Sequence, residues 1–143
     1  MELRFAKTDR RGHLPKQART GDAGLDLDAT EDHLLKPGER TTIGTGVAVE
    51  IPEGYAGLVL PRSGLATKYG LTLINSPGLI DPGYRGELLV AVVNQDPNQP
   101  VKVNRGDRIA QLLVVGLPGV EPVLVEELSE TERGDGGFGS TGS

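Results

Sequence analysis

The chain has 143 residues, a formal net charge of −5, no Cys and only two His. This length suits one domain with a sizeable core. The absence of cysteine excludes disulfides and thiolate metal sites, and the acidic balance argues against a general nucleic-acid binder. No apolar run approaches the roughly 20 residues that a membrane span needs, and no signal-peptide segment is evident, so we expect a cytoplasmic protein that binds no membrane.

Short apolar or alternating segments, separated by turns, indicate strands along most of the chain. The 21 Gly and 10 Pro supply those turns. We expect strands over residues 3–6, 25–29, 34–35, 41–51, 55–60, 71–75, 87–94, 101–103, 109–115 and 123–125. The long strand over residues 41–51 is expected to bend at Gly44 and Gly46, and residues 61–69 suit one short helix.

This pattern predicts an all-β fold, a jelly-roll-like β-sandwich or barrel of about ten short strands with one short helix and a flexible C-terminal tail. Residues 71–75 and 87–94 are expected to form the arms of a long hairpin. Residues 88–93 and 109–115 are apolar on both faces of their strands, which calls for cover on both sides. Because so small a domain offers little cover of its own, we expect an oligomer.

The C-terminal segment 133–143 has no apolar periodicity but concentrates groups that bind anions. Its glycines, among them Gly139, free backbone amides to curl around an anion, and Ser140 and Thr141 add hydroxyl donors. Arg133 supplies a fork of donors suited to phosphate, and Phe138 supplies an aromatic face. The segment is interpreted as a lid that orders over a nucleotide; taken alone, a disordered terminus explains it equally simply.

Asp81 lies just before a strong Pro-Gly turn signal and after the apolar residues Leu79 and Ile80. A carboxylate at a rigid edge, partly removed from water, is a suitable general base. Asp-Pro-Gly is also common simply because Asp caps turns. Both interpretations of Asp81 stay open on this pattern alone.

Arg62, Ser63 and Gly64 follow an apolar strand and begin the possible helix. Free amides at a helix start, a hydroxyl and a guanidinium together make a phosphate site. The simpler alternative is that Ser63 caps the helix and Arg62 is only exposed.

Asp26 and Asp28 stand two residues apart, on one face of a strand, where a pair of carboxylates can hold Mg²⁺ directly or through water. Alternating acidic residues are more often the solvated face of a strand. Gln111 interrupts an apolar run, so we expect it to be buried with a polar partner.

Taken together and in this order, these residues resemble the trimeric dUTPase (deoxyuridine 5′-triphosphate nucleotidohydrolase) family. All five motifs of that family are present, in register from residue 22 to the C-terminus. They are Asp22-Ala-Gly-Leu-Asp-Leu27, Pro61-Arg-Ser-Gly-Leu-Ala66, the block Asn75 to Glu87, Gly106-Asp-Arg-Ile-Ala-Gln-Leu-Leu113, and Arg133 to Gly142.

The resemblance implies that the chain hydrolyses dUTP to dUMP and pyrophosphate, limiting uracil in DNA and supplying dUMP for dTMP synthesis. It implies that Asp81 activates the water that attacks the α-phosphorus. The phosphates would be held by Arg62, Ser63, Gly64 and Gln111. Mg²⁺ would be chelated mainly by the phosphates, with Asp26 acting through water.

For the nucleoside, the resemblance implies that Asn75 and the backbone near Leu79, Ile80 and Leu89 read the uracil edge. Tyr84 would pack on the sugar and exclude a 2′-hydroxyl. The tail would close with Phe138 on the base and Arg133 at the γ-phosphate.

The resemblance also implies a homotrimer with active sites shared between subunits. Residues 1–132 would form the β-barrel domain and residues 133–143 its lid.

Two alternatives of other kinds remain open. dCTP deaminases resemble dUTPases in fold and in several motifs, and the chain could be deaminase-like or bifunctional. That chemistry needs a Glu on the strand after the Asp-Pro-Gly turn, where this chain has Ala91, and an aromatic that is usually Trp where it has Tyr84. A nucleotide-binding regulatory module without turnover is the other alternative, against which the retention of Asp81 and of the tail argues.

Overall fold

A computed structural model describes residues 1–139, which form ten strands and one short helix. The elements in chain order are β1 (Arg4–Lys7), β2 (Leu25–Asp28), β3 (His33–Leu35), β4 (Arg40–Glu50), β5 (Tyr55–Pro61), α1 (Ser63–Tyr69), β6 (Leu71–Leu73), β7 (Gly78–Ile80), β8 (Glu87–Asn94), β9 (Val101–Val103) and β10 (Arg108–Gly116). No helix within the described residues is long and apolar enough to cross a membrane.

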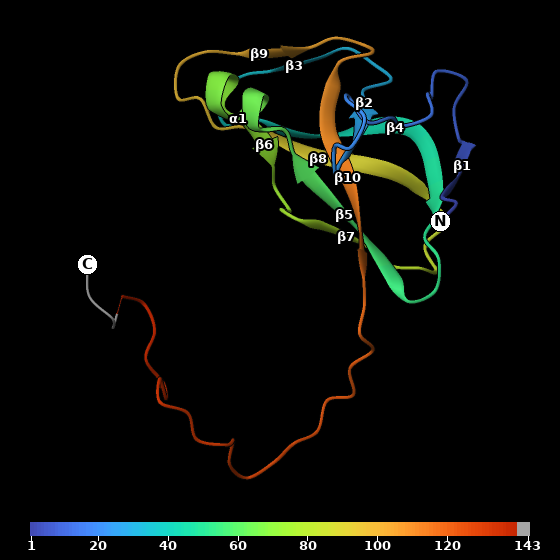
Figure 1. The fold of residues 1–143 in the computed structure, drawn as a ribbon. Coiled ribbons are helices and arrows are strands. Elements are labelled where there is room, and N and C mark those ends of the chain that lie inside the picture. Colours follow the sequence, from blue (N-terminus) through green and yellow to red (C-terminus); the bar gives the residue numbers. More distant parts are fainter. Residues whose placement is uncertain (140–143) are drawn as a thin grey trace.

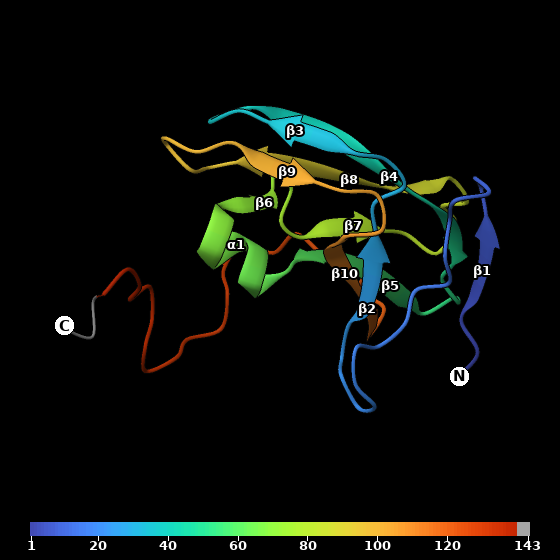
Figure 2. The ribbon, with the colours of Figure 1, turned by 90° about the horizontal axis from the view of Figure 1, so that it is seen from above.

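The strands form two four-stranded sheets and one small accessory sheet (Figures 1 and 2). One sheet has the order β1-β4-β8-β6, the other β2-β10-β5-β7, and β3 pairs with β9. Every pairing between named strands is antiparallel. The structure therefore confirms the predicted all-β, jelly-roll fold with its single short helix.

The core lies between the inner faces of the two large sheets. Leu88, Val90 and Val92 of β8 are almost fully buried, and Leu27 and Leu112 meet them from the other sheet within one apolar cluster. The intervening residues of β8 face outward, and Leu89 is 55% exposed. In the single chain, the second apolar face of this strand is thus uncovered.

The long strand β4 bends where its two glycines stand, as the sequence predicts. Its pairing with β8 shifts register between Gly44 and Ala48. Gly46 has a φ of +70°, and the Cα of Gly12 packs so closely against it that a side chain would be 2.7 Å from that atom. A glycine is required here for both reasons, the backbone angle and the close approach.

The predicted hairpin is present, because β6 pairs with β8 through partners such as Leu71 and Asn94. Between its arms the chain forms β7, which the sequence analysis missed and which pairs with β5 in the opposite sheet. The sequence of β7 begins with a glycine and runs directly into the Asp-Pro-Gly turn signal, so it was interpreted as part of the loop between the hairpin arms. The connection between β7 and β8 consequently crosses from one sheet to the other.

The expected strand at residues 123–125 is wrong. Those residues have no strand partner in the structure, and Leu124 is fully exposed. All residues from 116 to 135 are exposed, and the segment runs away from the body of the domain after β10 (Figure 1). A short apolar run alone does not make a strand where no neighbouring strand is available to pair with its backbone groups.

Asn94, at the end of β8, joins three parts of the chain in the core. Its side chain is fully buried, and its Nδ2 donates to the carbonyl oxygens of Leu35 (3.1 Å) and Gln99 (2.9 Å). Its Oδ1 accepts from the amide of Asp96 at 2.9 Å. The one side chain therefore fixes the β8–β9 connection against β3.

We predict that Asn94→Ala lowers the free energy of unfolding by about 3 kcal/mol, because buried backbone groups lose their partners. Urea unfolding at a fixed protein concentration measures the change. The matched control is Asn98→Ala, at an exposed position four residues further on. Equal stability of the two variants would contradict the role assigned to Asn94.

Candidate active site

Residues from three separate sequence motifs meet in one hollow at the edge of the second large sheet. Antiparallel pairing sets Gln111 of β10 opposite Asp26 of β2 on one side and Leu60 of β5 on the other. Arg62 follows directly after β5, so the same register brings it to this place. The hollow has a volume of about 350 Å³ and is lined by Ala18, Asp22, Ala23, Gly24, Asp26, Arg62, Ser63, Gly64 and Gln111.

The start of α1 shapes one wall of this hollow. Arg62 precedes the helix in an extended conformation, with φ −93° and ψ 127°, and the helix begins at Ser63. Ser63 is therefore the first helical residue. The simpler interpretation, in which the Ser63 side chain caps the helix, is wrong, because no side chain caps this helix. The amides of a first helical turn have no partners within their own helix, so those of Ser63 and Gly64 remain donors for a bound anion.

Asp26 lies between two arginines and is only 13% exposed. One carboxylate oxygen is 3.5 Å from Nε of Arg62, and the other is 3.3 Å from Nη1 of Arg108. Nη1 of Arg62 also donates to the carbonyl oxygen of Arg108 at 3.2 Å. The sequence analysis quoted Arg108 within a motif but gave it no role. Arg108 reaches this place because it begins β10 and pairs opposite Asp28, a register that the sequence does not show.

Asp28, on the same strand, lies in a different environment from Asp26. Burial raises the pKa of the Asp28 carboxyl, and the nearby Asp26 acts in the same direction. His13, whose Nδ1 is 3.7 Å from the carboxylate, opposes that change. The two carboxylates share a strand face, as the sequence predicts, but only Asp26 lines the hollow beside Ser63.

Gln111 is half-buried and has the polar partner that its place in an apolar run predicts. Its Nε2 donates to the carbonyl oxygen of Pro61 at 3.0 Å. Its Oε1 lies against Gly24, so closely that any side chain at residue 24 would collide with it. Gly24 thus makes room for Gln111 to reach the hollow.

A second, smaller hollow gathers the residues expected to read a base. It has a volume of about 50 Å³ and lies between β7 and β8, with Asn75 at its rim. Its lining residues are Val59, Leu73, Asn75, Gly78, Leu79, Ile80, Leu89, Val90 and Ala91. The two hollows have no lining residue in common.

Asp81 and Tyr84 stand at the two ends of the turn that follows β7. The amide of Tyr84 donates to the carbonyl oxygen of Asp81 at 3.1 Å, and the Tyr84 hydroxyl donates to the carbonyl oxygen of Glu87 at 2.8 Å. A side chain at Gly86 would lie 2.5 Å from the Tyr84 hydroxyl oxygen, so glycine is needed beside the ring. Asp81 is exposed in the single chain. The partial desolvation expected for it is absent because Leu79, on the edge strand β7, is itself 65% exposed.

The described part of the tail does not join either hollow. Nε of Arg133 donates to the carbonyl oxygen of Gly136 at 2.7 Å, and Phe138 is fully exposed. Gly139 has a φ of +80°. Ser140 and Thr141 lie outside the described residues. Up to residue 139, no tail residue lines either hollow.

Comparison with known proteins places this chain in a family. A sequence model of the dUTPase family matches residues 10–142. A deoxyuridine 5′-triphosphate nucleotidohydrolase of Thermobifida fusca is 55% identical over 129 residues, which is 90% of this chain and 72% of that protein. The enzyme of the same name from Corynebacterium glutamicum is 50% identical over 140 residues, 98% of this chain and 94% of that protein. The chain belongs to the dUTPase family.

Solved dUTPase structures share the fold over almost the whole chain. The dUTPase of Staphylococcus bacteriophage 80alpha, solved with dUPNHPP, has a TM-score of 0.92 at 33% identity and covers 99% of each chain. A mutant dUTPase from phage phi11 of S. aureus, described with a structural Mg(II) ion, has a TM-score of 0.84 at 30% identity and covers 91% of this chain and 100% of that one.

The side chains around the larger hollow suit a metal ion that is held mainly by the phosphates of a bound nucleotide and only partly by the protein. Within residues 1–139, no three His, Asp or Glu side chains gather into a metal cage. The carboxylate of Asp26 borders the hollow, and both its oxygens already face arginines. Magnesium commonly keeps several waters and binds through one carboxylate and substrate phosphates, and this arrangement fits that mode.

Proposed function

We propose that this dUTPase-family chain hydrolyses dUTP to dUMP and pyrophosphate. The observation that carries the proposal is the hollow in which Arg62, Ser63, Gly64 and Gln111 converge beside Asp26. It presents a guanidinium, a hydroxyl, an amide side chain and free backbone amides, which are the donors that a triphosphate needs. The related phage enzyme was solved with dUPNHPP, a ligand of this kind.

In the proposed reaction, Asp81 accepts a proton from a water molecule that attacks the α-phosphorus. The new bond joins the water oxygen to that phosphorus, and the bond from the phosphorus to the bridging oxygen breaks. Pyrophosphate leaves with the electron pair. The chain's main contribution is positioning and charge neutralisation, so no covalent nucleophile on the protein is required.

Arg62, Ser63, Gly64 and Gln111 would hold the phosphates during this attack. Mg²⁺, when bound, supplies charge neutralisation across the phosphate oxygens. Asp26 would face it through bound water. A metal described in the phage phi11 relative is consistent with this requirement.

Recognition of the nucleoside would come from the second hollow and from the turn. Asn75 and the backbone near Leu79, Ile80 and Leu89 would read the uracil edge. Tyr84 would pack on the deoxyribose. Its ring is oriented by the hydrogen bond from its hydroxyl to the Glu87 carbonyl oxygen, and the absence of a side chain at Gly86 makes room for it. A ring held in this orientation would clash with a 2′-hydroxyl.

We further propose that the active enzyme is a homotrimer in which subunits share each site. The residues assigned to the phosphates and those assigned to the base line separate hollows, and the tail as far as residue 139 reaches neither. Leu89 faces outward from the sheet, and the segment after β10 exposes several large apolar side chains. They are Leu117, Val120, Val123, Leu124, Val125 and Leu128. Residues 133–143, with Arg133, Phe138, Gly139, Ser140 and Thr141, would close as a lid over a site of another subunit.

The position of Ala91 argues against deamination. Ala91 lines the base-reading hollow, where a dCTP deaminase would carry its Glu. None of the described residues lining that hollow has a carboxylate. A hollow of apolar side chains and one amide suits recognition of a base more than proton transfer to it.

The proposed function predicts rapid pyrophosphate release from dUTP with Mg²⁺, and much slower release from dCTP, dTTP and UTP. The four nucleotides are compared side by side, and the product bases are identified by chromatography. Conversion of dCTP to a uracil nucleotide would assign the chain to the deaminases. No turnover of any of the four would make a binding module the better interpretation.

Asp81→Asn is predicted to lower kcat by about 10²- to 10⁴-fold, because the variant loses the proposed base. Affinity for a non-hydrolysable dUTP analogue, measured by calorimetry, should change little, since Asp81 holds no phosphate. The control is Asp32→Asn, an exposed carboxylate whose Oδ1 accepts the amide of Arg105, a bond that asparagine retains. Normal turnover by the Asp81 variant would remove Asp81 from the mechanism.

If subunits share each site, trimers that contain two different inactive variants should regain activity. A chain lacking residues 133–143 and the Asp81→Asn chain should each form trimers with little activity. When the two are unfolded together and refolded, some sites combine Asp81 of one subunit with the tail of another, so activity should reappear. Sedimentation confirms assembly in each sample. Failure of the mixture to recover activity, with mixed trimers present, would show that each chain supplies both parts of its own site.

A further inference from the structure

The turn that carries Asp81 and Tyr84 bridges two different sheets. It leaves β7, on the edge of the second sheet, and enters β8, in the middle of the first. Asp81, Gly83 and Tyr84 are all exposed. The position of Asp81 therefore depends on whatever ties this turn to the rest of the domain.

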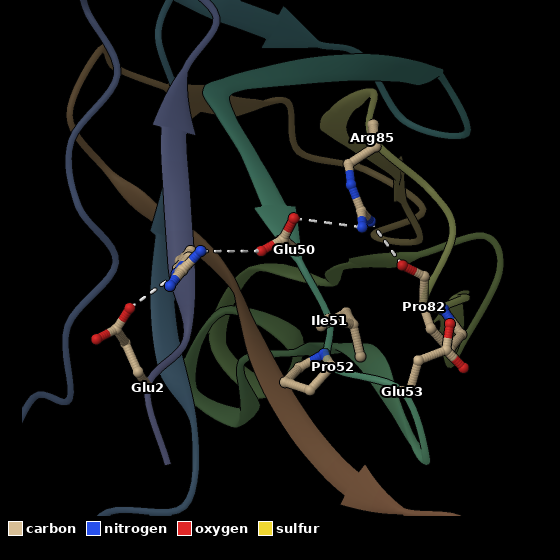
Figure 3. Close-up of a pocket in the computed structure, with 8 residues that line it drawn as sticks. Glu2, Glu50, Ile51, Pro52, Glu53, Pro82 and Arg85 are labelled. Carbon is tan, nitrogen blue, oxygen red and sulfur yellow. Dashed lines mark hydrogen bonds and ion pairs between the residues drawn. The ribbon is translucent and has the colours of Figure 1, made fainter.

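Arg85 makes such a tie with its side chain (Figure 3). Its Nη1 donates to the carbonyl oxygen of Pro82 at 2.6 Å and to that of Tyr84 at 3.2 Å. Its Nη2 lies 3.4 Å from a carboxylate oxygen of Glu50. One guanidinium thus contacts two carbonyls within the turn and an acidic residue outside it.

Glu50 lies on β4, two residues beyond Ala48, which pairs with Glu87 at the start of β8. It is the last residue of β4 and stands opposite Arg4 of β1 in the sheet. Its second carboxylate oxygen is 3.9 Å from Nη1 of Arg4. Glu50, Arg4 and Arg85 border one hollow of about 460 Å³, which separates the turn from the strand ends.

We propose that Arg85 is a positioning residue, which with Glu50 holds the turn so that Asp81 meets the attacking water. The inference rests on the proposed function, because it assigns Arg85 a task in that reaction. A planar guanidinium suits the task, since its fixed fork of donors spans two carbonyls and a carboxylate at once. Arg85 acts through the backbone and touches no reacting atom.

The exposure of the pair separates this role from one in overall stability. The side chains of Arg85 and Glu50 are 56% and 47% exposed, and ion pairs at that exposure contribute little to folding. A small loss of alignment at a reacting centre, by contrast, has a large effect on rate. Removal of Arg85 should therefore slow the reaction without unfolding the domain.

The test compares Arg85→Ala with the unaltered chain in dUTP hydrolysis. We expect kcat to fall by at least about tenfold, with KM and the melting temperature nearly unchanged. Arg85→Lys should lie between the two, because one ammonium cannot reproduce the fork. Hydrogen exchange at the Tyr84 amide, which closes the turn on Asp81, should speed up in Arg85→Ala.

Two further variants sharpen the result. Arg4→Ala removes the other arginine beside Glu50 and leaves the turn's contacts in place, so its kcat should match the unaltered chain. Glu50→Gln keeps a hydrogen-bond acceptor but loses the charge, and its kcat should fall less than that of Arg85→Ala. Because both act on the same contact, adding Glu50→Gln to Arg85→Ala should cause little further loss.

Several outcomes would overturn the inference. They are an unchanged kcat in Arg85→Ala, a loss confined to KM, an equal loss in Arg4→Ala, and unchanged exchange at the Tyr84 amide. Inactivity of the unaltered chain toward dUTP would instead refute the proposed function. In that case the exchange measurement still decides whether Arg85 holds the turn.

Discussion

The register of three neighbouring strands determines where the chemistry of this protein lies. β10 pairs with β2 and with β5, and this pairing sets Gln111 beside Asp26 on one side and next to the end of β5 on the other. Arg62 follows that end directly. Because side chains alternate between the faces of a strand, a slip of one residue would turn these groups away from one another. Residues from three distant parts of the sequence therefore depend on one set of backbone hydrogen bonds.

The residues assigned to the phosphates and the residues assigned to the reaction stand on different kinds of structural element. Arg62, Asp26 and Gln111 stand on or beside paired strands, and their side chains contact one another or nearby backbone. Asp81 stands on a turn that Arg85 ties to the exposed Glu50, and Arg133 stands on an exposed segment whose contacts are local. A rigid support suits the binding of a triphosphate, whose charges must be matched in place. The proposed assembly of the site from several subunits would explain why Asp81 and the tail of one chain lie open to solvent.

Much of the fold was predictable from the sequence because most strands are bounded by glycine or proline and alternate in polarity. The bend at Gly44 and Gly46 and the hairpin of β6 and β8 followed from such patterns. β7 was not predicted, because it begins with a glycine and adjoins a strong turn signal, both of which favour a loop. Residues 123–125 show the opposite error: their apolar pattern is that of a strand, but the single chain offers them no partner. Pairing is a property of neighbours, and a local pattern does not report it.

The same distinction governs the candidate site. Arg62, Asp81 and Gln111 indicated the family because they fall within motifs that occur in register, and their roles in the reaction stay predictions. The pairing of Asp26 with Arg108 was not predictable, since it depends on the register between β2 and β10. The net charge of −5 gave no sign of it either. Charge balance over a whole chain is a sum, whereas a phosphate site depends on which arginines a fold brings to one edge of a sheet.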